Sequence, residues 1–324
     1  MKFLLQRLAQ MVAVVLAVTF LCFAALNFLG DPLFNILGPI ADENSGEEYA
    51  EVRAEARAEY NLDKPFPERY VRWVGGMVQG DFGRSFKNQT EVSTELSNRL
   101  PVTVFLMVYA QVLAVVIAVP WAVISAARAY RTVDKVSTVV SFGLLGIPVF
   151  ALVVLLSYGI QLKWDPQWGD DSLFPGRYDD ESLMSRLRSL AIPATALAIP
   201  LIAIYQRLLR TDLISTLQED FIAVARAKGM SERHVLFRHA LRPSLFSMLT
   251  VFGIQTGALI GGSIVVEQFF AIPGVGRALV EAIIRDDFPL VLGVVVVVSV
   301  IFVVVNFLVD LAYTFLDPRV KFDG

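Results

Sequence analysis

Uninterrupted apolar stretches, rather than the one-sided patterns of soluble helices and strands, dominate this chain. Because the hydrocarbon core of a bilayer is ~30 Å thick, a helix needs about 20 residues to cross it. The segments that reach this length run approximately from Gln10 to Leu29, Pro101 to Ala127, Val133 to Gln161, Leu190 to Leu209, Leu245 to Val266, and Leu290 to Leu316. The pattern predicts an all-α, polytopic membrane protein with six transmembrane helices.

The first apolar segment also resembles a signal peptide, because Lys2 and Arg7 precede it. Its apolar length exceeds the ~7–15 residues of a typical signal-peptide core, and no convincing pair of small residues marks a cleavage site. We therefore expect it to be a retained membrane span.

Charge is scarce and unevenly distributed. Only 18% of the 324 residues are charged, against about a quarter in soluble domains. Half of the 28 basic residues fall in alternate short loops and near both ends: Lys2, Arg7, Arg128, Arg131, Lys135, Arg207, Arg210, Arg226, Lys228, Arg233, Arg238, Arg242, Arg319 and Lys321. The other loops are acidic, with Asp165, Asp170, Asp171, Asp179, Asp180, Glu181, Glu267, Glu281, Asp286 and Asp287. Because cytoplasmic loops are enriched in Lys and Arg, both termini are predicted to be cytoplasmic.

Chemistry typical of enzymes is absent from the sequence. Cys22 is the only cysteine, and the only histidines, His234 and His239, are five residues apart, which we expect to place them off a shared helical face. The sequence has no HExxH, GxSxG, GxGxxG or GxxxxGK[ST] motif. We predict no catalytic residue, no metal site, no cofactor bound by this chain and no nucleic-acid partner.

The predicted spans carry few polar residues. Asp310 is the one acid that comes close to lying within a span, and Gln111, Gln255 and Asn306 suit either helix packing or a pathway. No residue can be singled out as lining a translocation pathway. Glycines at four-residue spacing favour close packing within the chain or with another subunit: Gly253, Gly257 and Gly261. Prolines inside or near the spans predict kinks: Pro120, Pro148, Pro193 and Pro200.

The longest outer segment runs from Asp31 to Arg99 and includes a predicted helix from Glu47 to Tyr60. One face of that helix is acidic, with Glu47, Glu51, Glu55 and Glu59. Like charges four residues apart destabilise a helix slightly. We favour a solvated face over a docking surface for a partner.

The loop between the fourth and fifth predicted spans carries the clearest functional pattern. Residues from Asp220 onward predict a short helix that ends at Gly229, a residue that tolerates the left-handed conformation after a helix. Ser231 is a candidate N-cap for a second short helix, which we expect to stop near Pro243. Apolar residues on two short helices outside the bilayer favour docking into a partner, although a basic helix lying on the membrane surface is an equal alternative.

This loop resembles a known motif. Ala223-Val-Ala-Arg-Ala-Lys-Gly229 followed by His239-Ala-Leu241 is similar to the EAA loop of bacterial ATP-binding-cassette (ABC) importer permeases. That motif reads Glu-Ala-Ala, three residues, Gly, nine residues and Ile-x-Leu-Pro. The spacing to Gly matches, and Leu241 falls on the motif's Leu. The differences are Ala223, Val224, His239 and Arg242, with Pro243 one place late, and they resemble the peptide/nickel branch of the family.

Other stretches resemble the same branch, so that the resemblance covers nearly the whole chain. They are Phe3 to Arg7, Tyr60-Asn-Leu-Asp-Lys-Pro65, Arg69 to Trp73, Gly80-Asp-Phe-Gly-Arg-Ser85, Leu100 to Thr103, Glu267, Pro273-Gly-Val-Gly276, Ala282 to Pro289, and Asp317-Pro-Arg319. The resemblance is strongest to the B-type permease of oligopeptide or dipeptide importers.

The resemblance implies the type I ABC importer transmembrane fold, with an extracellular segment after the first helix. It implies a bacterial plasma-membrane assembly with a second, C-type permease, ATPase subunits that bind ATP and Mg, and an outer substrate-binding protein. It implies that the chain divides into a first helix (1–30), an outer segment (31–99), a core (100–316) with a coupling loop (212–243), and a tail (317–324).

The resemblance further implies which residues couple the chain to an ATPase: Ala223, Val224, Ala225, Arg226, Ala227, Lys228, Gly229, Met230, Ser231 and Glu232. Peptide is the expected cargo. Nickel, haem or glutathione within the same family, and a solitary ion-coupled carrier, remain alternatives.

Overall fold

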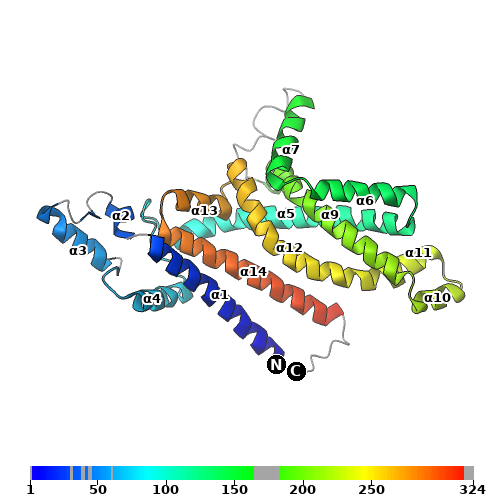
Figure 1. The fold of residues 1–324 in the computed structure, drawn as a ribbon, viewed down its shortest axis with the longest axis horizontal. Helices are drawn as coiled ribbons and strands as arrows, with labels where there is room; N and C mark the ends of the chain where they lie inside the picture. Colours follow the sequence, from blue (N-terminus) through cyan, green and yellow to red (C-terminus); the bar gives the residue numbers. More distant parts are fainter. Residues whose placement is uncertain are drawn as a thin grey trace. The chain divides into compact units, whose positions relative to one another are not determined.

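A computed structural model describes residues 2–29, 32–37, 41–42, 46–59, 61–163, 178 and 182–316. These residues form helices and no β-strand (Figure 1). The helices in chain order are α1 (Lys2–Leu29), α2 (Pro32–Leu37), η3 (Glu47–Tyr49), α3 (Ala50–Glu59), α4 (Phe66–Val78), α5 (Val92–Ala127), α6 (Thr132–Leu145), α7 (Val149–Lys163), α8 (Leu183–Ser189), α9 (Ala191–Thr216), α10 (Asp220–Ala227), α11 (Glu232–His234), η5 (Val235–Ala240), α12 (Leu241–Phe269), α13 (Val275–Ile284) and α14 (Phe288–Leu316).

Five of the six predicted spans correspond to single apolar helices that are long enough to cross a membrane. Among the described residues, five single segments qualify: Gln6–Phe28, Val92–Ala127, Ala191–Thr216, Glu232–Phe269 and Phe288–Leu311. The remaining prediction, from Val133 to Gln161, corresponds to a broken span made of α6 and the apolar part of α7, which meet at an angle of 100°. The all-α membrane fold is therefore confirmed, with one span bent.

Pro148 explains the bend. It lacks a backbone N–H, and its ring disfavours helical geometry at Ile147, so a helix ends before it. The amide of Gly146 closes α6 by donating to Phe142 at 3.2 Å. Pro193 lies in the first turn of α9, where a missing N–H is tolerated, whereas Pro120 and Pro200 lie inside α5 and α9, which continue through them.

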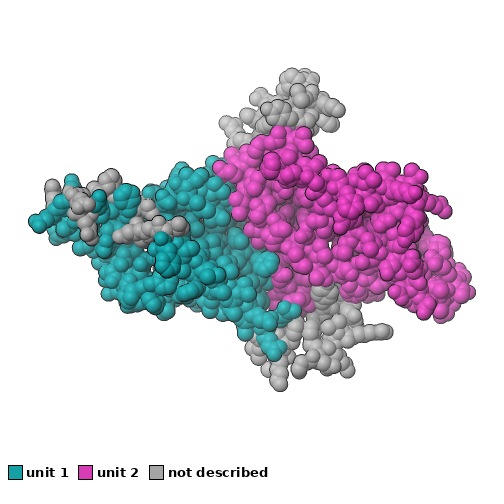
Figure 2. All heavy atoms as spheres, viewed as in Figure 1, with its two compact units in different colours: residues 1–102, 273–304, 322–324 teal, residues 103–272, 305–321 magenta. Residues whose placement is uncertain are grey.

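The described residues fall into two compact units (Figure 2). The first contains the chain up to Val102 together with Pro273–Val304. The second contains Thr103–Ile272 and the remainder of α14 from Val305.

The first unit has a small apolar core where α5 begins beside α13 and α14. Its buried members are Val92, Leu96, Val275, Ala282, Leu290, Val291 and Val294. Gly293 allows this close approach, because a Cβ there would lie 2.6 Å from Cγ1 of Val92. The loop after α4 is tied to the same core, since the Ser85 hydroxyl and the Phe86 amide both donate to the Asp287 carboxylate.

Helix α9 is the centre of the second unit, where it packs against α6, α7 and α12. A stripe at four-residue spacing forms its buried face: Leu197, Leu201, Tyr205, Leu209 and Leu213. Residues four apart on a helix share a face, so this stripe explains how α9 is fixed along its length. The helix leads directly into the loop that the sequence singles out.

Candidate functional site

The loop after α9 begins with α10, a short helix with one buried and one exposed side. Ile222 and Ala225 are buried, three residues apart on the side that faces the neighbouring helices. Phe221 and Val224 are 48% and 53% exposed on the other side. The two buried residues thus hold the helix against the protein, while Phe221 and Val224 present apolar surface outward.

A tight turn at Gly229 follows α10. Gly229 has φ of 79°, and its amide donates to the Arg226 carbonyl at 2.9 Å. This left-handed conformation confirms the sequence prediction. Ser231 then caps the next helix by accepting a hydrogen bond from the His234 amide at 3.4 Å, which confirms the predicted N-cap.

Arg226 and Glu232 bridge the turn with two hydrogen bonds. Nε and one terminal nitrogen of Arg226 donate to the two carboxylate oxygens of Glu232 at 2.8 and 3.1 Å. The hydrogen bond to Glu232 raises the pKa of the Arg226 guanidinium, so this partner remains charged. A planar guanidinium that meets both oxygens of a carboxylate fixes orientation as well as distance. The pair therefore sets the angle between α10 and α11.

The second helix does not stop at Pro243, and the sequence prediction is wrong on this point. α11 passes into η5, a π-helix over Val235–Ala240, which continues directly into α12. A proline inside an α-helix clashes with the carbonyl four residues earlier. That carbonyl belongs to His239, within the wider π-helical turn, which removes this obstacle.

The π-helix also corrects the prediction for the two histidines. The rings of His234 and His239 lie 5.6 Å apart between centroids. An i to i+5 pair lies on different faces of a regular α-helix, but the i to i+5 hydrogen bonds of a π-helix bring such residues closer to one face. The pair therefore shares a face, together with exposed Arg233 and Arg238 nearby.

The ten residues predicted for coupling lie together on α10, the Gly229 turn and the start of α11. Ala225 is buried and Met230 half-buried, and the other eight are exposed: Ala223, Val224, Arg226, Ala227, Lys228, Gly229, Ser231 and Glu232. Phe221 of α10 and Phe237 of η5 are also exposed, Phe237 by 51%, although the predicted coupling residues do not include them. The sequence did carry a signal for Phe221: it lies three residues before Val224 and seven before Lys228, which places all three on one helical face.

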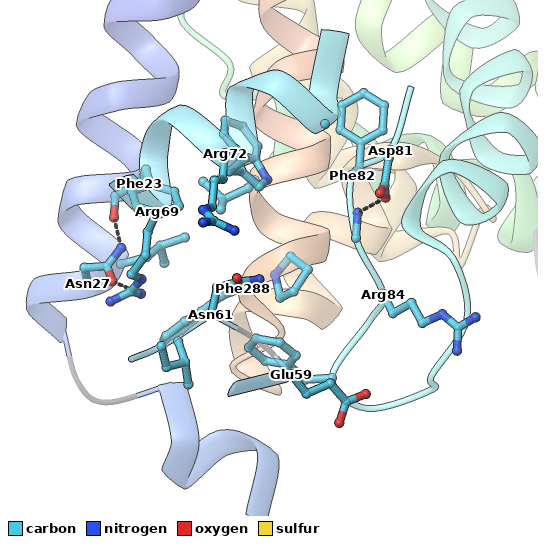
Figure 3. A pocket seen from close by; sticks show the side chains of 18 residues that line it. Phe23, Asn27, Glu59, Asn61, Arg69, Arg72, Asp81, Phe82, Arg84 and Phe288 are labelled. Carbon is cyan, nitrogen blue, oxygen red and sulfur yellow. Dashed lines mark hydrogen bonds between the residues drawn. The ribbon is translucent and has the colours of Figure 1, made fainter. Parts of the chain in front are cut away.

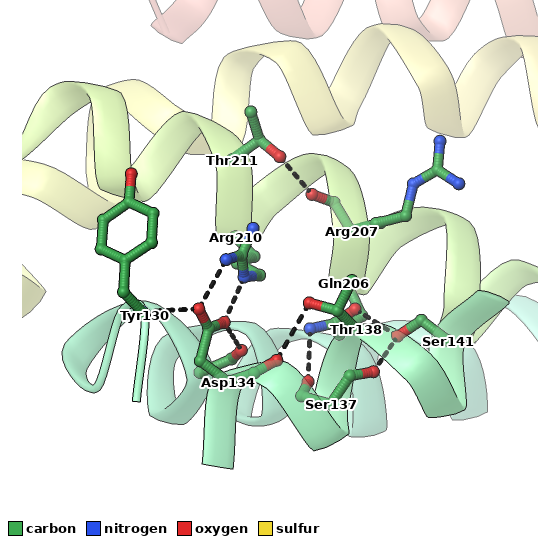
Figure 4. A network of polar contacts seen from close by, with 10 residues as sticks. Tyr130, Asp134, Ser137, Thr138, Ser141, Gln206, Arg207, Arg210 and Thr211 are labelled. Atoms are coloured by element: carbon green, nitrogen blue, oxygen red, sulfur yellow. Dashed lines mark hydrogen bonds and ion pairs between the residues drawn. The ribbon is translucent and has the colours of Figure 1, made fainter. Parts of the chain in front are cut away.

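Upstream of the loop, an ion pair ties α9 to α6 (Figure 4). Arg210 donates two hydrogen bonds to Asp134, one of them at 2.6 Å, and their side chains are 18% and 3% exposed. Asp134 also accepts from the Ser125 hydroxyl at 2.6 Å and the Tyr130 amide at 2.8 Å. Such extra donors stabilise a buried carboxylate.

A neutral hydrogen-bonded group continues this contact one turn further along α9. The Gln206 amide nitrogen donates to the Ser137 hydroxyl at 2.9 Å, and its oxygen accepts from the Ser141 hydroxyl at 2.6 Å (Figure 4). Ser137 and Ser141 are one turn apart on α6, so both ends of the amide are satisfied. α6 and α9 are consequently linked at two successive levels next to the loop.

The chain matches known proteins over most of its length. Residues 118–322 match the family described as "Binding-protein-dependent transport system inner membrane component". The chain belongs to this family. It is accordingly a transport component of the plasma membrane with several membrane-spanning segments.

Three relatives are similar to this permease over 99% of each chain. The oligopeptide transport system permease protein AppB of Bacillus subtilis is 34% identical over 324 residues. A putative peptide permease protein of Brucella suis is 36% identical over 327 residues. A probable peptide ABC transporter permease protein of Sinorhizobium fredii, y4tP, is 34% identical over 325 residues.

Polar residues inside the permease spans form packing contacts between helices. Gln111 on α5 donates to Thr256 on α12 at 3.0 Å and accepts from the Tyr205 hydroxyl on α9 at 2.8 Å. Thr103 donates to the buried Glu267 at 2.7 Å. These buried groups are paired, as groups without access to water must be.

The predicted glycine stripe on α12 allows close helix packing within the permease at only part of its length. A Cβ at Gly253 would lie 3.1 Å from Val309 on α14, which is a close helix approach. A Cβ at Gly261 would meet no described residue within 4 Å, and Gly261 is exposed. Next to it, a Cβ at Gly262 would lie 3.1 Å from Leu197 on α9, so Gly262 is the residue that is closely approached near that end.

Proposed function

We propose that this permease forms, together with a second permease subunit, the pathway by which an ABC importer carries peptides across the bacterial plasma membrane. The similar proteins from Bacillus, Brucella and Sinorhizobium are all named as peptide or oligopeptide permeases, and they align over nearly the whole chain. The alignment at full length supports the same role, since it includes both the spans and the loops.

The exposed side of α10 and the Gly229 turn is proposed to seat on an ATPase subunit. Three apolar side chains of the loop helices α10 and η5 are about half exposed: Phe221, Val224 and Phe237. Apolar side chains in such a position are stabilised when a partner removes them from water. The basic residues Arg233 and Arg238 beside them favour an acidic rim on that partner.

ATP chemistry belongs to the partner subunits in this proposal. The permease sequence has no GxxxxGK[ST] loop, so ATP and Mg are held elsewhere in the assembly. Closure of the ATPases would push on α10. The Arg226–Glu232 bridge and the α6–α9 contacts at Asp134 and Gln206 would pass that displacement to the spans.

The distribution of Lys and Arg supports the orientation required for this role. We infer that both termini and the coupling loop 212–243 are cytoplasmic, and that residues 31–99 lie outside, where a substrate-binding protein delivers the peptide. The acidic face of α3 is exposed within that outer segment, at Glu51, Glu55 and Glu59.

Reconstitution of the complete transporter tests this function. The permease, its natural second permease, ATPases and binding protein are placed in vesicles, and mass spectrometry identifies what the binding protein retains. Uptake of that compound should require ATP and all components, and the compound should be a peptide. Retention and ATP-dependent uptake of a metal or haem, with no peptide transport, would contradict the proposed cargo while leaving the coupling proposal standing.

A further inference from the structure

A pocket of about 410 Å³ lies in the first unit (Figure 3). Phe23 and Asn27 of α1, Arg69, Arg72 and Trp73 of α4, and Phe288 of α14 line it. Arg69 and Arg72 are three residues apart, on one face of α4. Figure 3 shows Arg69 extending towards Asn27, to which its guanidinium donates a hydrogen bond.

Trp73 supplies a hydrogen-bond donor that lacks an acceptor. Its indole Nε1 is buried and has no hydrogen-bond partner among the described residues. The ring itself is held in place by Phe23 and Tyr70, at centroid distances of 5.9 and 6.4 Å. A buried donor without an acceptor carries the full cost of losing water, and a ligand oxygen in the pocket would remove that cost.

The position of the pocket places it at one membrane surface. The apolar span of α1 ends at Phe28, and that of α14 begins at Phe288, so both spans terminate here. On α4, Val71 and Val78 are 68% and 78% exposed, seven residues apart on one face. An amphipathic helix with such a face lies along the headgroup region of a bilayer.

Aromatic rings beside the pocket support its placement at the headgroup region. Phe20 and Phe23 of α1 pack against Phe66 and Tyr70 of α4, with centroid distances between 5.3 and 5.9 Å. Aromatic residues concentrate where lipid headgroups meet the acyl chains. On α1, Leu21 and Phe28 are 67% and 90% exposed, which leaves apolar surface next to the pocket for acyl chains.

We propose that this pocket binds the phosphodiester headgroup of a membrane phospholipid. Trp73 Nε1 and the guanidinium groups of Arg69 and Arg72 donate to the phosphate oxygens, and the acyl chains lie along the exposed apolar surface of α1. Arginine suits this role because its planar group binds phosphate through paired N–H donors. Arg72 also pairs with Glu68 at 2.8 Å. This ion pair is exposed and contributes little stability, so Glu68 competes only weakly with a phosphate for Arg72.

Acidic side chains at the pocket select among headgroups. Glu59 and Asp81 also line it, and Asp81 already accepts from the Gly83 amide at 2.8 Å. A carboxylate next to the phosphate site favours a zwitterionic headgroup, whose ammonium group it can pair with, over phosphatidylglycerol. The expected order of affinity is phosphatidylethanolamine above phosphatidylglycerol, with inorganic phosphate far weaker because it lacks acyl chains.

Native mass spectrometry of the full transporter in mild detergent tests the proposal. Wild type and Trp73→Phe, which removes the N–H but keeps a ring, are titrated with each phospholipid and with inorganic phosphate. We expect Trp73→Phe and Arg72→Gln each to lower the affinity for the tightest-bound phospholipid about tenfold, the scale of one hydrogen bond to a charged group. The matched control Trp121→Phe, on α5 in the other unit, should not change it.

Thermal unfolding provides a second measurement that does not depend on the mass-spectrometry titration. Added phospholipid should raise the unfolding temperature of wild type and of Trp121→Phe, and should raise that of Trp73→Phe less. Equal lipid affinity and equal stabilisation in all variants would overturn the proposal. Release of a peptide in place of a phospholipid from the wild-type pocket would overturn it as well.

Discussion

Arg226 holds Glu232 through two hydrogen bonds, at 2.8 and 3.1 Å, across the left-handed turn at Gly229. This relationship fixes two short helices of the proposed coupling loop at one angle. The side chains are 42% and 72% exposed, so water and salt weaken the attraction. The pair matters for geometry more than for global stability.

Removing either partner should weaken coupling without unfolding the permease. We expect Arg226→Met or Glu232→Gln to lower substrate-stimulated ATP hydrolysis by roughly twofold to fivefold, the range for an exposed ion pair. The exchanged double variant Arg226→Glu/Glu232→Arg should recover much of the loss, because the bridge can form in reverse. Strictly additive losses in the double variant would show that the two residues act separately.

The Asp134–Arg210 pair should behave differently, because it is largely buried. Asp134→Asn leaves the Arg210 guanidinium without its charged partner, and breaking such pairs costs about 3–5 kcal/mol. We expect a clear fall in the thermal unfolding temperature of the purified transporter. Arg207→Met is the matched control on the same helix, since Arg207 is exposed and stacks on Phe142. A fall of equal size in the control would refute the assignment.

Cysteine labelling tests the orientation. In a Cys22→Ser background, a single cysteine replaces Glu55 of α3 or Ser231 of the coupling loop, both of which are exposed. An impermeant thiol reagent applied to intact cells, which retain the permeability barrier, should label the first position only. Labelling of the Ser231→Cys variant before lysis would place the loop outside and remove the basis for coupling to an ATPase.

Local sequence signals were enough to predict the coupling turn. Gly229 follows a short amphipathic pattern and precedes Ser231, and these residues adopt the expected left-handed turn and N-cap. The long spans were also predictable, since apolar length alone decides them. Both kinds of prediction depend on residues that are neighbours in sequence.

Other features could not be predicted because they depend on distant or competing contacts. Pro243 is a local stop signal, yet the π-helix at Val235–Ala240 allows α12 to include it. The Asp134–Arg210 pair joins residues 76 positions apart, and periodicity gives no information on such a contact. Pro148 predicts a kink, but the packing of α6 and α7 against α9 determines the angle of 100°.

Substitutions at Gly229 can distinguish the effect of backbone strain from the effect of lost contact with a partner. Its φ of 79° costs a residue with a side chain roughly 1–2 kcal/mol, a cost that applies to Ala and Glu alike. A Cβ there would meet no described residue of this chain within 4 Å. A larger loss for Gly229→Glu than for Gly229→Ala would therefore come from a partner that occupies the open space.

Gly80 supplies a matched control in the segment that we propose to lie outside. Its φ is 84°, and a Cβ there also meets no described residue within 4 Å. Gly80→Glu thus introduces the same backbone strain and the same charge, on the side of the membrane proposed to lie opposite the ATPase contact. Its effect on ATP hydrolysis measures strain and added charge without that contact.

The central measurement is substrate-stimulated ATP hydrolysis by the reconstituted transporter carrying Gly229→Glu. We expect stimulation and peptide uptake both to be abolished while the protein stays at normal abundance in the membrane, and we expect Gly229→Ala and Gly80→Glu to retain most activity. Stimulation and uptake at wild-type levels in Gly229→Glu would show that this loop is not the coupling element.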